Sequence, residues 1–221
     1  DLSQEGHQPM LSEDGRYAMV FNGEVYNHQA LRNELESTRT FNWRGHSDTE
    51  VMLAMISSWG VEQAVSKFTG MFAIAVWDCS EKKLHLVRDR IGEKPLYYGW
   101  CDGTFVFGSE LKALKKYPGF SNNIDRQALT LYLRYMAIPA PFSIYRGIYK
   151  LQPGCILSLG LNEVSMPTDE VAPHAPFSYK GLHLRQYWSL HETTESGQAS
   201  LITSETDALE MLETQLRKSI K

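Results

Sequence analysis

The Asn22-Gly23 pair is the stretch whose residue types could most directly do chemistry. Apolar or aromatic residues flank it on both sides, in Ala18–Phe21 and at Val25 and Tyr26. Asn-Gly between two such runs predicts a tight β-hairpin, because both central positions of the turn need positive φ angles. The pair could also present an amide side chain beside an unhindered backbone N–H, and two donors aimed at one point form an oxyanion hole.

Other candidate constellations fail on geometry or spacing. His46-Ser47-Asp48 contains the residue types of a catalytic triad, but sequence neighbours cannot converge as nucleophile, base and orienting group. No two of the seven histidines have metal-ligand spacing, so we expect no metal site. Gly92-Glu93-Lys94-Pro95 lacks the glycines and the Lys-Ser/Thr pair of a phosphate loop. We interpret Arg88-Asp89-Arg90 as a solvated or ion-paired turn.

The composition indicates an ordinary soluble globular protein. The 221 residues are 43% hydrophobic and 22% charged, with a net charge of −4 and no basic run, so neither a nucleic acid nor a membrane surface is an expected partner. No apolar run is long enough to span a bilayer, and the N-terminal residues lack the charged-then-apolar pattern of a secretory signal. Cys79, Cys101 and Cys155 predict free thiols in a reducing cytoplasm, in the core or at the surface, without a catalytic role.

The elements that must position the Asn-Gly pair come from the N-terminal third. A strand over Tyr17–Phe21 leads into it, and Asn27 is a candidate N-cap for a helix that ends near Glu36. Ser47 and Glu50 fit a capping box, in which the serine accepts from the N3 amide and the glutamate reaches back. We expect a helix from Val51 to Trp59, ended by Gly60, and a shorter one over residues 61–68.

The remaining pattern predicts strands followed by helices and irregular chain. The expected strands are 71–77, 83–88, 96–100, 104–107 and 155–159, and the expected helices are 110–117 and 125–135. The proline-rich stretch 137–154 is predicted to be irregular, residues 168–181 an excursion loop, residues 189–204 a linker, and residues 205–220 an amphipathic helix. This order favours an α+β layered domain, with two packed sheets and helices outside.

Phe21-Asn22-Gly23-Glu24-Val25-Tyr26-Asn27 resembles the glutamine-site motif of class II glutamine amidotransferases, especially those of the asparagine-synthetase branch. Further matches follow in the family's order and extend nearly to Trp188. They are Gly45–Glu50, Gly70–Ala75, Arg88–Tyr98, Phe107–Leu114, Pro139–Pro141, Ser143–Ile148 and Lys150–Gly154. Any one motif is modest support, but the ordered set is strong.

The resemblance implies the N-terminal-nucleophile hydrolase fold, a four-layer αββα sandwich, here incomplete at the N-terminus. In the family an N-terminal cysteine attacks the glutamine carboxamide, with its own α-amine as base. Carried over, Asn22 Nδ2 and the Gly23 N–H would form the oxyanion hole, and Glu24 and Asp48 would bind the α-ammonium of glutamine. Asp48 would also favour the helix by its place in the first turn, and an exposed strand carboxylate is the competing interpretation of Glu24.

The resemblance also implies roles for residues and segments around that site. Arg88, Asp89, Arg90 and Lys94 would have structural roles, with an interface to a following domain as one option. Residues 1–188 would form the amidotransferase domain, 189–204 a linker, and 205–221 the first helix of a synthetase domain of the ATP-pyrophosphatase type. The first residue is Asp1, so a preceding segment would supply the nucleophile and an arginine for the substrate carboxylate. We therefore expect residues 1–221 to be inactive alone.

The full enzyme would convert aspartate, ATP and glutamine to asparagine, AMP, pyrophosphate and glutamate. The amidotransferase domain would need no cofactor or metal, while ATP and magnesium would bind the synthetase domain, and a homodimer is the family expectation. Two alternatives stay open. One is an amidotransferase that delivers ammonia to another acceptor, and the other is a catalytically silent structural or regulatory module.

Overall fold

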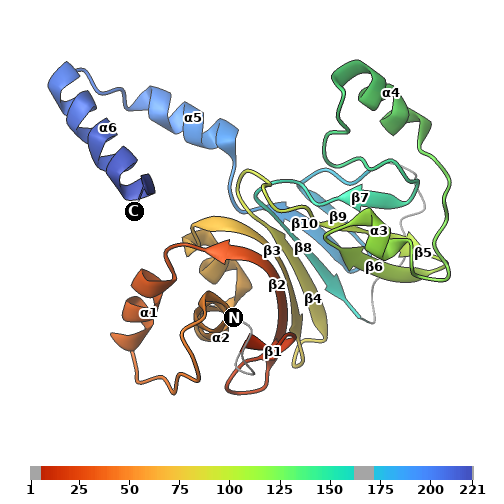
Figure 1. The fold of residues 1–221 in the computed structure, drawn as a ribbon, viewed down its shortest axis with the longest axis horizontal. Coiled ribbons are helices and arrows are strands. Elements are labelled where there is room, and N and C mark those ends of the chain that lie inside the picture. The colour runs from red at the N-terminus through yellow and green to blue at the C-terminus, as the bar shows by residue number, and fades with distance from the viewer. Residues whose placement is uncertain (1–5, 162–171, 221) are drawn as a thin grey trace. The chain divides into compact units, whose positions relative to one another are not determined.

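The computed structural model of the protein describes residues 6–161 and 172–220 (Figure 1). By internal contacts the chain divides into two compact units, Asp1–Trp188 and Ser189–Lys221, and each is described by itself.

The first unit is built on two antiparallel sheets. The larger sheet has the strand order β1-β2-β3-β4-β8-β10-β9, and the smaller sheet has the order β6-β5-β7. The larger sheet consists of β1 (Met10–Leu11), β2 (Tyr17–Val25), β3 (Gly70–Asp78), β4 (Lys83–Arg88), β8 (Cys155–Gly160), β10 (Leu182–Gln186) and β9 (Phe177–Tyr179). The smaller consists of β5 (Tyr97–Cys101), β6 (Thr104–Gly108) and β7 (Ile148–Lys150).

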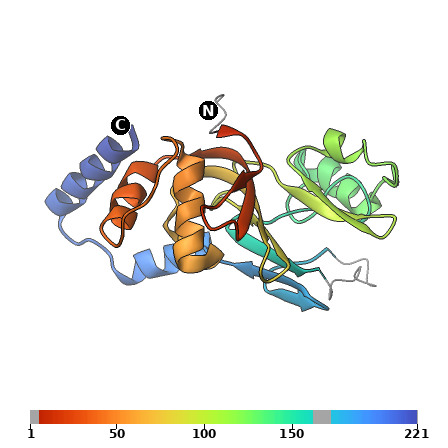
Figure 2. The ribbon, with the colours of Figure 1, turned by 90° about the horizontal axis from the view of Figure 1, so that it is seen from below.

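Two helices, α1 (His28–Glu36) and α2 (Asp48–Lys67), cover one face of the larger sheet (Figure 2). Leu31 and Leu35 of α1 are buried with residues of α2, β2 and β3 in one apolar cluster. Alternate residues of β3, such as Ile74 and Val76, point into this cluster, because side chains of a strand alternate between the faces of the sheet.

Local signals set the ends of these two helices. Ser47 caps α2 by accepting a hydrogen bond from the Glu50 N–H at 3.3 Å, as predicted, but Glu50 does not complete the box. Its carboxylate accepts instead from the backbone N–H groups of Arg44 and Gly45, at 2.7 and 3.0 Å. Asn27 precedes α1 without capping it by its side chain, and Gly60 breaks α2 at a φ of 79°.

The opposite face of the larger sheet packs against the smaller sheet. Ala73 and Ala75 of β3 and Leu157 of β8 are buried there with Tyr98 and Trp100 of β5. A third cluster joins Cys101 and Ile148 to Leu114 of the short helix α3 (Leu111–Leu114). The layers are therefore helix, sheet, sheet and helix, as predicted, and α4 (Arg126–Tyr135) follows α3 in the chain (Figure 1).

The second unit contains α5 (Leu190–Ala199) and α6 (Glu205–Ile220). The amphipathic helix expected at 205–220 is present, but most of the predicted linker 189–204 is helical. Ser189 caps α5 by accepting from the Glu192 N–H at 3.3 Å, and Glu192 lies in the first turn, where its charge favours the helix dipole. Every residue of α5 is exposed, so no apolar periodicity marked it.

Other differences between prediction and structure concern short strands and one shortened helix. The proline-rich stretch 137–154, predicted to be irregular, contributes β7, and β9 lies within the predicted excursion loop 168–181, whose first residues are outside the described part. β10 was not predicted and pairs with both β8 and β9. The helix predicted at 110–117 is reduced to the four residues of α3. Strands this short acquire their conformation from their partners rather than from their own sequence.

Candidate functional site

Asn22 and Gly23 lie inside β2 and do not form a turn, so the hairpin prediction is wrong. Asn22 pairs with Ala73 and Gly23 with Phe72 in the continuous β2–β3 ladder. Gly23 has a φ of +149°, and a Cβ atom there would lie 2.0 Å from the Met71 carbonyl oxygen. Glycine is required at this position because the two strands approach closely, not because the chain reverses.

The Gly23 N–H points to the edge of β2 that faces away from β3. The Phe21 N–H donates to Gln8 Oε1 at 2.7 Å on this edge, and the Val25 N–H donates to Asp48 Oδ2 at 2.9 Å. Alternate residues of an antiparallel strand direct their N–H groups to the same side, so Gly23 shares this direction. Side chains cap the amides on either side of it, whereas no group in the described part of the chain caps Gly23.

The Asn22 side chain lies on the opposite face of the larger sheet from α1 and α2. It is exposed, and its Nδ2 donates to Ser109 Oγ at 3.0 Å. Ser109 directly follows β6, so this hydrogen bond connects the edge of the larger sheet to the end of a strand of the smaller one. An amide side chain and a backbone N–H with no cap in the described chain are thus adjacent on one strand.

The two predicted carboxylates, Glu24 and Asp48, lie at the same end of β2 as these donors. Glu24 is exposed on the same face as Asn22 because it lies two residues further along β2. Asp48 begins α2, and besides its bond to Val25 it accepts from the Thr49 N–H through Oδ1 at 2.8 Å. All four predicted site residues therefore gather at the C-terminal end of β2, and their binding roles stay predictions.

The buried carboxylate of Asp89 supports this end of β2 through the neighbouring strand β3. Asp89 is fully buried, and its carboxylate accepts from the N–H groups of Phe72, Glu93 and Lys94 at 3.2, 2.9 and 2.9 Å. Phe72 is the partner of Gly23, so Asp89 holds the strand that Gly23 packs against. The hint in the sequence was that Asp89 directly follows a predicted strand, 83–88, whose leucines alternate with polar residues.

Arg88 is buried beside Asp89, so the solvated form of the turn expected at residues 88–90 is wrong, whereas the contacts of both residues agree with the structural roles that the resemblance implied. Its guanidinium donates to the carbonyl oxygens of Leu151, Gly92 and Lys94 at 2.7, 2.7 and 2.8 Å. Burial lowers the pKa of Arg88, although the Asp89 carboxylate opposes this effect. Three carbonyl acceptors compensate for the loss of hydration. Arg88 therefore connects the loop at Gly92 and Lys94 to Leu151.

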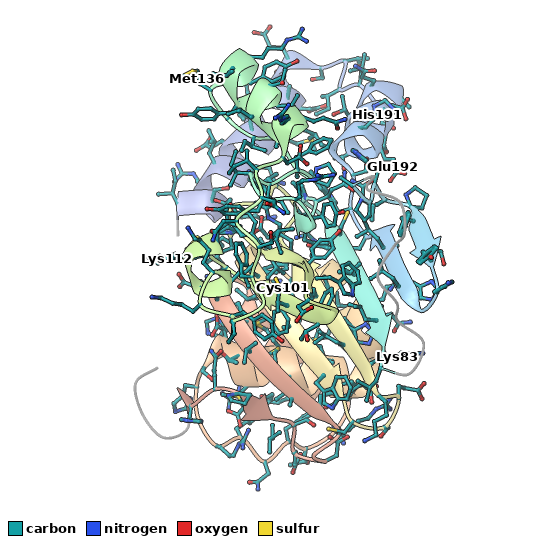
Figure 3. All side chains as sticks on the ribbon, turned by 90° about the vertical axis from the view of Figure 1, so that its right-hand side faces the viewer. Lys83, Cys101, Lys112, Met136, His191 and Glu192 are labelled. Atoms are coloured by element: carbon teal, nitrogen blue, oxygen red, sulfur yellow. The ribbon has the colours of Figure 1, made fainter. Side chains whose placement is uncertain are left out.

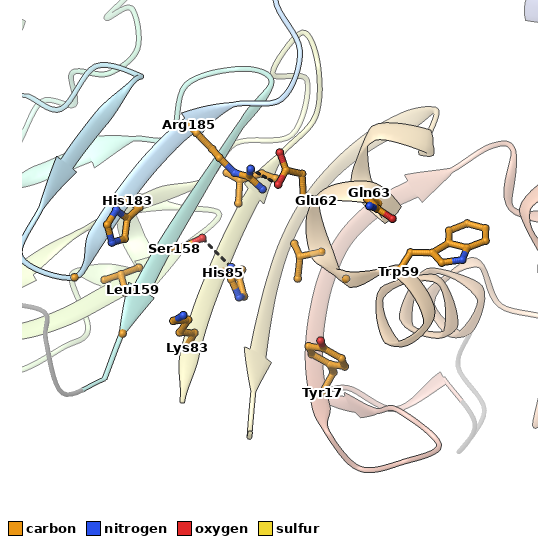
Figure 4. A pocket seen from close by; sticks show the side chains of 15 residues that line it. Tyr17, Trp59, Glu62, Gln63, Lys83, His85, Ser158, Leu159, His183 and Arg185 are labelled. Atoms are coloured by element: carbon orange, nitrogen blue, oxygen red, sulfur yellow. Dashed lines mark hydrogen bonds and ion pairs between the residues drawn. The ribbon is translucent and has the colours of Figure 1, made fainter. Parts of the chain in front are cut away.

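Two cavities in the described part of the first unit are lined by residues other than those predicted for the site. One cavity of about 530 Å³ lies on the helix-covered face of the larger sheet, between α2 and strands β4, β8 and β10 (Figure 4). Within it His85 Nδ1 is 2.8 Å from Ser158 Oγ, and Arg185 pairs with Glu62. A second cavity, of about 800 Å³, lies between residues 11–15 and 39–44. The candidate site is instead an open strand edge.

Cys79 lies just beyond Asp78, the partner of Tyr17 at the start of β2, and neither of the other two cysteines is suited to act as a nucleophile near Gly23. All three are free thiols, and Cys101 and Cys155 are buried in the sheets (Figure 3 labels Cys101). Burial raises the pKa of the Cys155 thiol to about 12 and also raises the pKa of Cys101. Both thiols are therefore protonated near neutral pH, and a protonated thiol is a poor nucleophile.

The family model of the glutamine amidotransferase domain matches residues 1–169, which include the whole arrangement around β2. This chain belongs to the class II glutamine amidotransferases. Asparagine synthetase [glutamine-hydrolyzing] 1 of Bacillus subtilis is 38% identical over 151 residues, or 68% of this chain and 23% of that protein. A putative asparagine synthetase [glutamine-hydrolyzing] 2 of Methanocaldococcus jannaschii is 36% identical over 169 residues, or 69% and 32%.

The fold of this amidotransferase is also found among solved structures. The glutamine phosphoribosylpyrophosphate amidotransferase of B. subtilis superimposes with a TM-score of 0.55 at 18% identity, over 84% of this chain and 33% of that one. This likeness supports the N-terminal-nucleophile hydrolase architecture. The chain spans 23% and 32% of the lengths of the two curated relatives named above. In the described part of the amidotransferase, no helix is long and apolar enough to cross a membrane.

Proposed function

We propose that this chain is the glutamine-hydrolysing domain of an asparagine synthetase and that it supplies ammonia to a synthetase domain of the same protein. There, ATP and magnesium would activate aspartate, and ammonia would convert the activated aspartate to asparagine. The names of the curated relatives support this choice of acceptor. The free thiols support a reducing, cytoplasmic location. A homodimer is part of the proposal on family grounds alone.

The pair of donors on β2 carries the hydrolytic part of the proposal. Attack on the glutamine carboxamide places a negative charge on its oxygen, and preorganised donors stabilise that charge as it forms. The Gly23 N–H is fixed by the β2–β3 ladder and directed to the open edge, and the Asn22 amide lies beside it. Glycine lets β2 approach β3 closely at this position, which fixes where the Gly23 N–H is held.

The nucleophile in this proposal is the family's N-terminal cysteine, which is not among residues 1–221. Its thiolate would attack the carboxamide carbon, ammonia would leave, and water would hydrolyse the thioester to glutamate. Asp48 and Glu24 would hold the substrate ammonium by charge-assisted hydrogen bonds. In the structure Asp48 Oδ2 makes one bond, to Val25, and a carboxylate oxygen can accept a second.

The test uses the full-length protein that contains these residues. Glutamine alone should yield glutamate and ammonia, and glutamine with aspartate, ATP and magnesium should yield asparagine, AMP and pyrophosphate. Asn22→Ala should lower kcat for glutamine hydrolysis by roughly 10²–10³. It should leave asparagine formation from free ammonia unchanged, because that reaction bypasses β2.

Two results would contradict the proposal in different ways. Absence of glutamine hydrolysis by the wild-type protein would indicate a silent module. Hydrolysis without asparagine formation would keep the glutaminase and require another ammonia acceptor.

A further inference from the structure

We infer that Ser109 is a positioning residue, which orients the Asn22 amide as an oxyanion donor. The inference rests on the proposed glutamine hydrolysis and extends it to a residue of the smaller sheet. Ser109 Oγ accepts from Asn22 Nδ2 at 3.0 Å, across 87 residues of sequence.

Ser109 is held by structure on both sides. The preceding residue, Gly108, ends β6 and pairs with Tyr97 of β5. On the other side α3 begins at Leu111, and its Leu114 is buried against the smaller sheet. Leu114 also contacts Gly108 closely, since a Cβ at Gly108 would lie 3.3 Å from Leu114 Cδ2. The serine hydroxyl is therefore presented from a short, well-anchored segment rather than from a long loop.

The chemistry of the amide makes this contact useful. A side-chain amide carries two N–H bonds, so one can be held by Ser109 while the other stays available to a developing oxyanion. Asn22 is exposed, and the described residues give its side chain no other hydrogen bond, so without Ser109 its torsions would be free. A donor that is already oriented costs no reorganisation in the transition state. Ser109 itself touches no reacting atom.

A purely structural link between the sheets is the competing interpretation, and the two make different predictions. A solvent-exposed hydrogen bond between neutral groups contributes little to stability. A positioning role predicts a loss in kcat at nearly constant KM, because an oriented oxyanion donor acts in the transition state and not in the ground state. It also predicts that Ser109 has no effect once Asn22 is removed.

The experiment is a double-mutant cycle in the full-length protein, with Ser109→Ala, Asn22→Ala and the double variant. We expect Ser109→Ala to lower kcat for glutamine hydrolysis by about tenfold with KM nearly unchanged. Ser109→Thr keeps the hydroxyl and should retain most of the activity. In the Asn22→Ala background, Ser109→Ala should cause no further loss. Glu110→Gln, an exposed neighbour paired with Lys112, is the matched control and should be silent.

Two kinetic outcomes would overturn the inference. One is a Ser109→Ala variant with wild-type kcat, and the other is a loss that adds in full to that of Asn22→Ala. A crystal structure of the Ser109→Ala variant decides the same question without any assay, because an unchanged Asn22 side-chain orientation would also refute it. Failure of the proposed function is distinct, since then the wild-type protein itself would not hydrolyse glutamine.

Discussion

Asp48 and Val25 are joined by a hydrogen bond of 2.9 Å, from the Val25 N–H to Asp48 Oδ2. The carboxylate at the start of α2 thereby caps the edge of β2 two residues beyond Gly23. One side chain thus serves the helix, the strand edge and, in our proposal, the substrate ammonium. The bond to Val25 needs an acceptor oxygen, whereas the first turn of α2 and the substrate ammonium both favour the negative charge.

Two substitutions of Asp48 separate these roles. Asp48→Asn keeps one acceptor oxygen, for Val25, but loses the charge and the acceptor for the Thr49 N–H, so KM for glutamine should rise by about tenfold or more while stability falls less than in Asp48→Ala. Asp48→Ala also leaves the Val25 N–H without its acceptor and should lower the free energy of unfolding by about 1–3 kcal/mol. Steady-state kinetics and urea unfolding measure the two effects. An unchanged KM in Asp48→Asn would remove Asp48 from the substrate site.

Gly23→Ala should destabilise the protein by about 2–4 kcal/mol, because the added Cβ would overlap the Met71 carbonyl oxygen and the φ of +149° disfavours alanine. Gly15→Ala is the matched control. Gly15 also has a positive φ, of +69°, but a Cβ there meets nothing within 4 Å. We expect Gly15→Ala to lower the free energy of unfolding by about 1–2 kcal/mol. Equal losses in urea unfolding at the two positions would show that close strand approach does not explain Gly23.

Asp89→Asn should cost about 3 kcal/mol or more in the free energy of unfolding. The carboxylate is fully buried and accepts from three backbone N–H groups, and an amide side chain offers one acceptor oxygen and two unwanted donors. Asp102→Asn is the control, because Asp102 is exposed at a positive φ that asparagine tolerates. If Asp89→Asn lowers the free energy of unfolding by less than about 1 kcal/mol, Asp89 does not hold β3 and the following loop in place as we infer.

His85 predicts a pH dependence of stability. Burial lowers its pKa in the folded protein, the Lys83 and Arg185 charges lower it further, and Asp78 opposes them. The unfolded chain therefore binds the proton more readily than the folded protein. The contribution of His85 is fully present above its unfolded pKa of about 6.5 and is lost as the pH falls from there through the folded pKa.

Urea unfolding at a series of pH values from 7.5 to 5 tests this prediction. Wild-type stability should decrease over that range, and the decrease should be shallower in His85→Gln, which cannot take up the proton. Ser158→Ala is a useful control because it removes the hydrogen-bond partner of His85 at 2.8 Å but leaves the titrating ring. An identical pH profile in wild type and His85→Gln would exclude His85 as the cause.

Much of the architecture could be predicted from local patterns. The Ser47 cap, the apolar run that becomes β3 and the paired Leu31 and Leu35 of α1 each indicate an element from its own residues. The order of strands and helices then favours two sheets between helical layers, which the structure confirms. The ordered motifs around Asn22-Gly23 point to the amidotransferase family, and the family model confirms it.

The tertiary structure decided the features that depend on contacts between residues far apart in the sequence. Asn-Gly is compatible with a turn by local energetics, and only the pairing of Gly23 with Phe72 makes it the middle of a strand. The sequence was compatible with a solvated or ion-paired turn at Asp89, and only the fold brings the N–H groups of three other residues around its carboxylate. The bond from Asn22 to Ser109 spans 87 residues. Sequence patterns report preferences over a few neighbouring residues, whereas strand register, burial of a charge and the partner of a side chain depend on the whole packed chain.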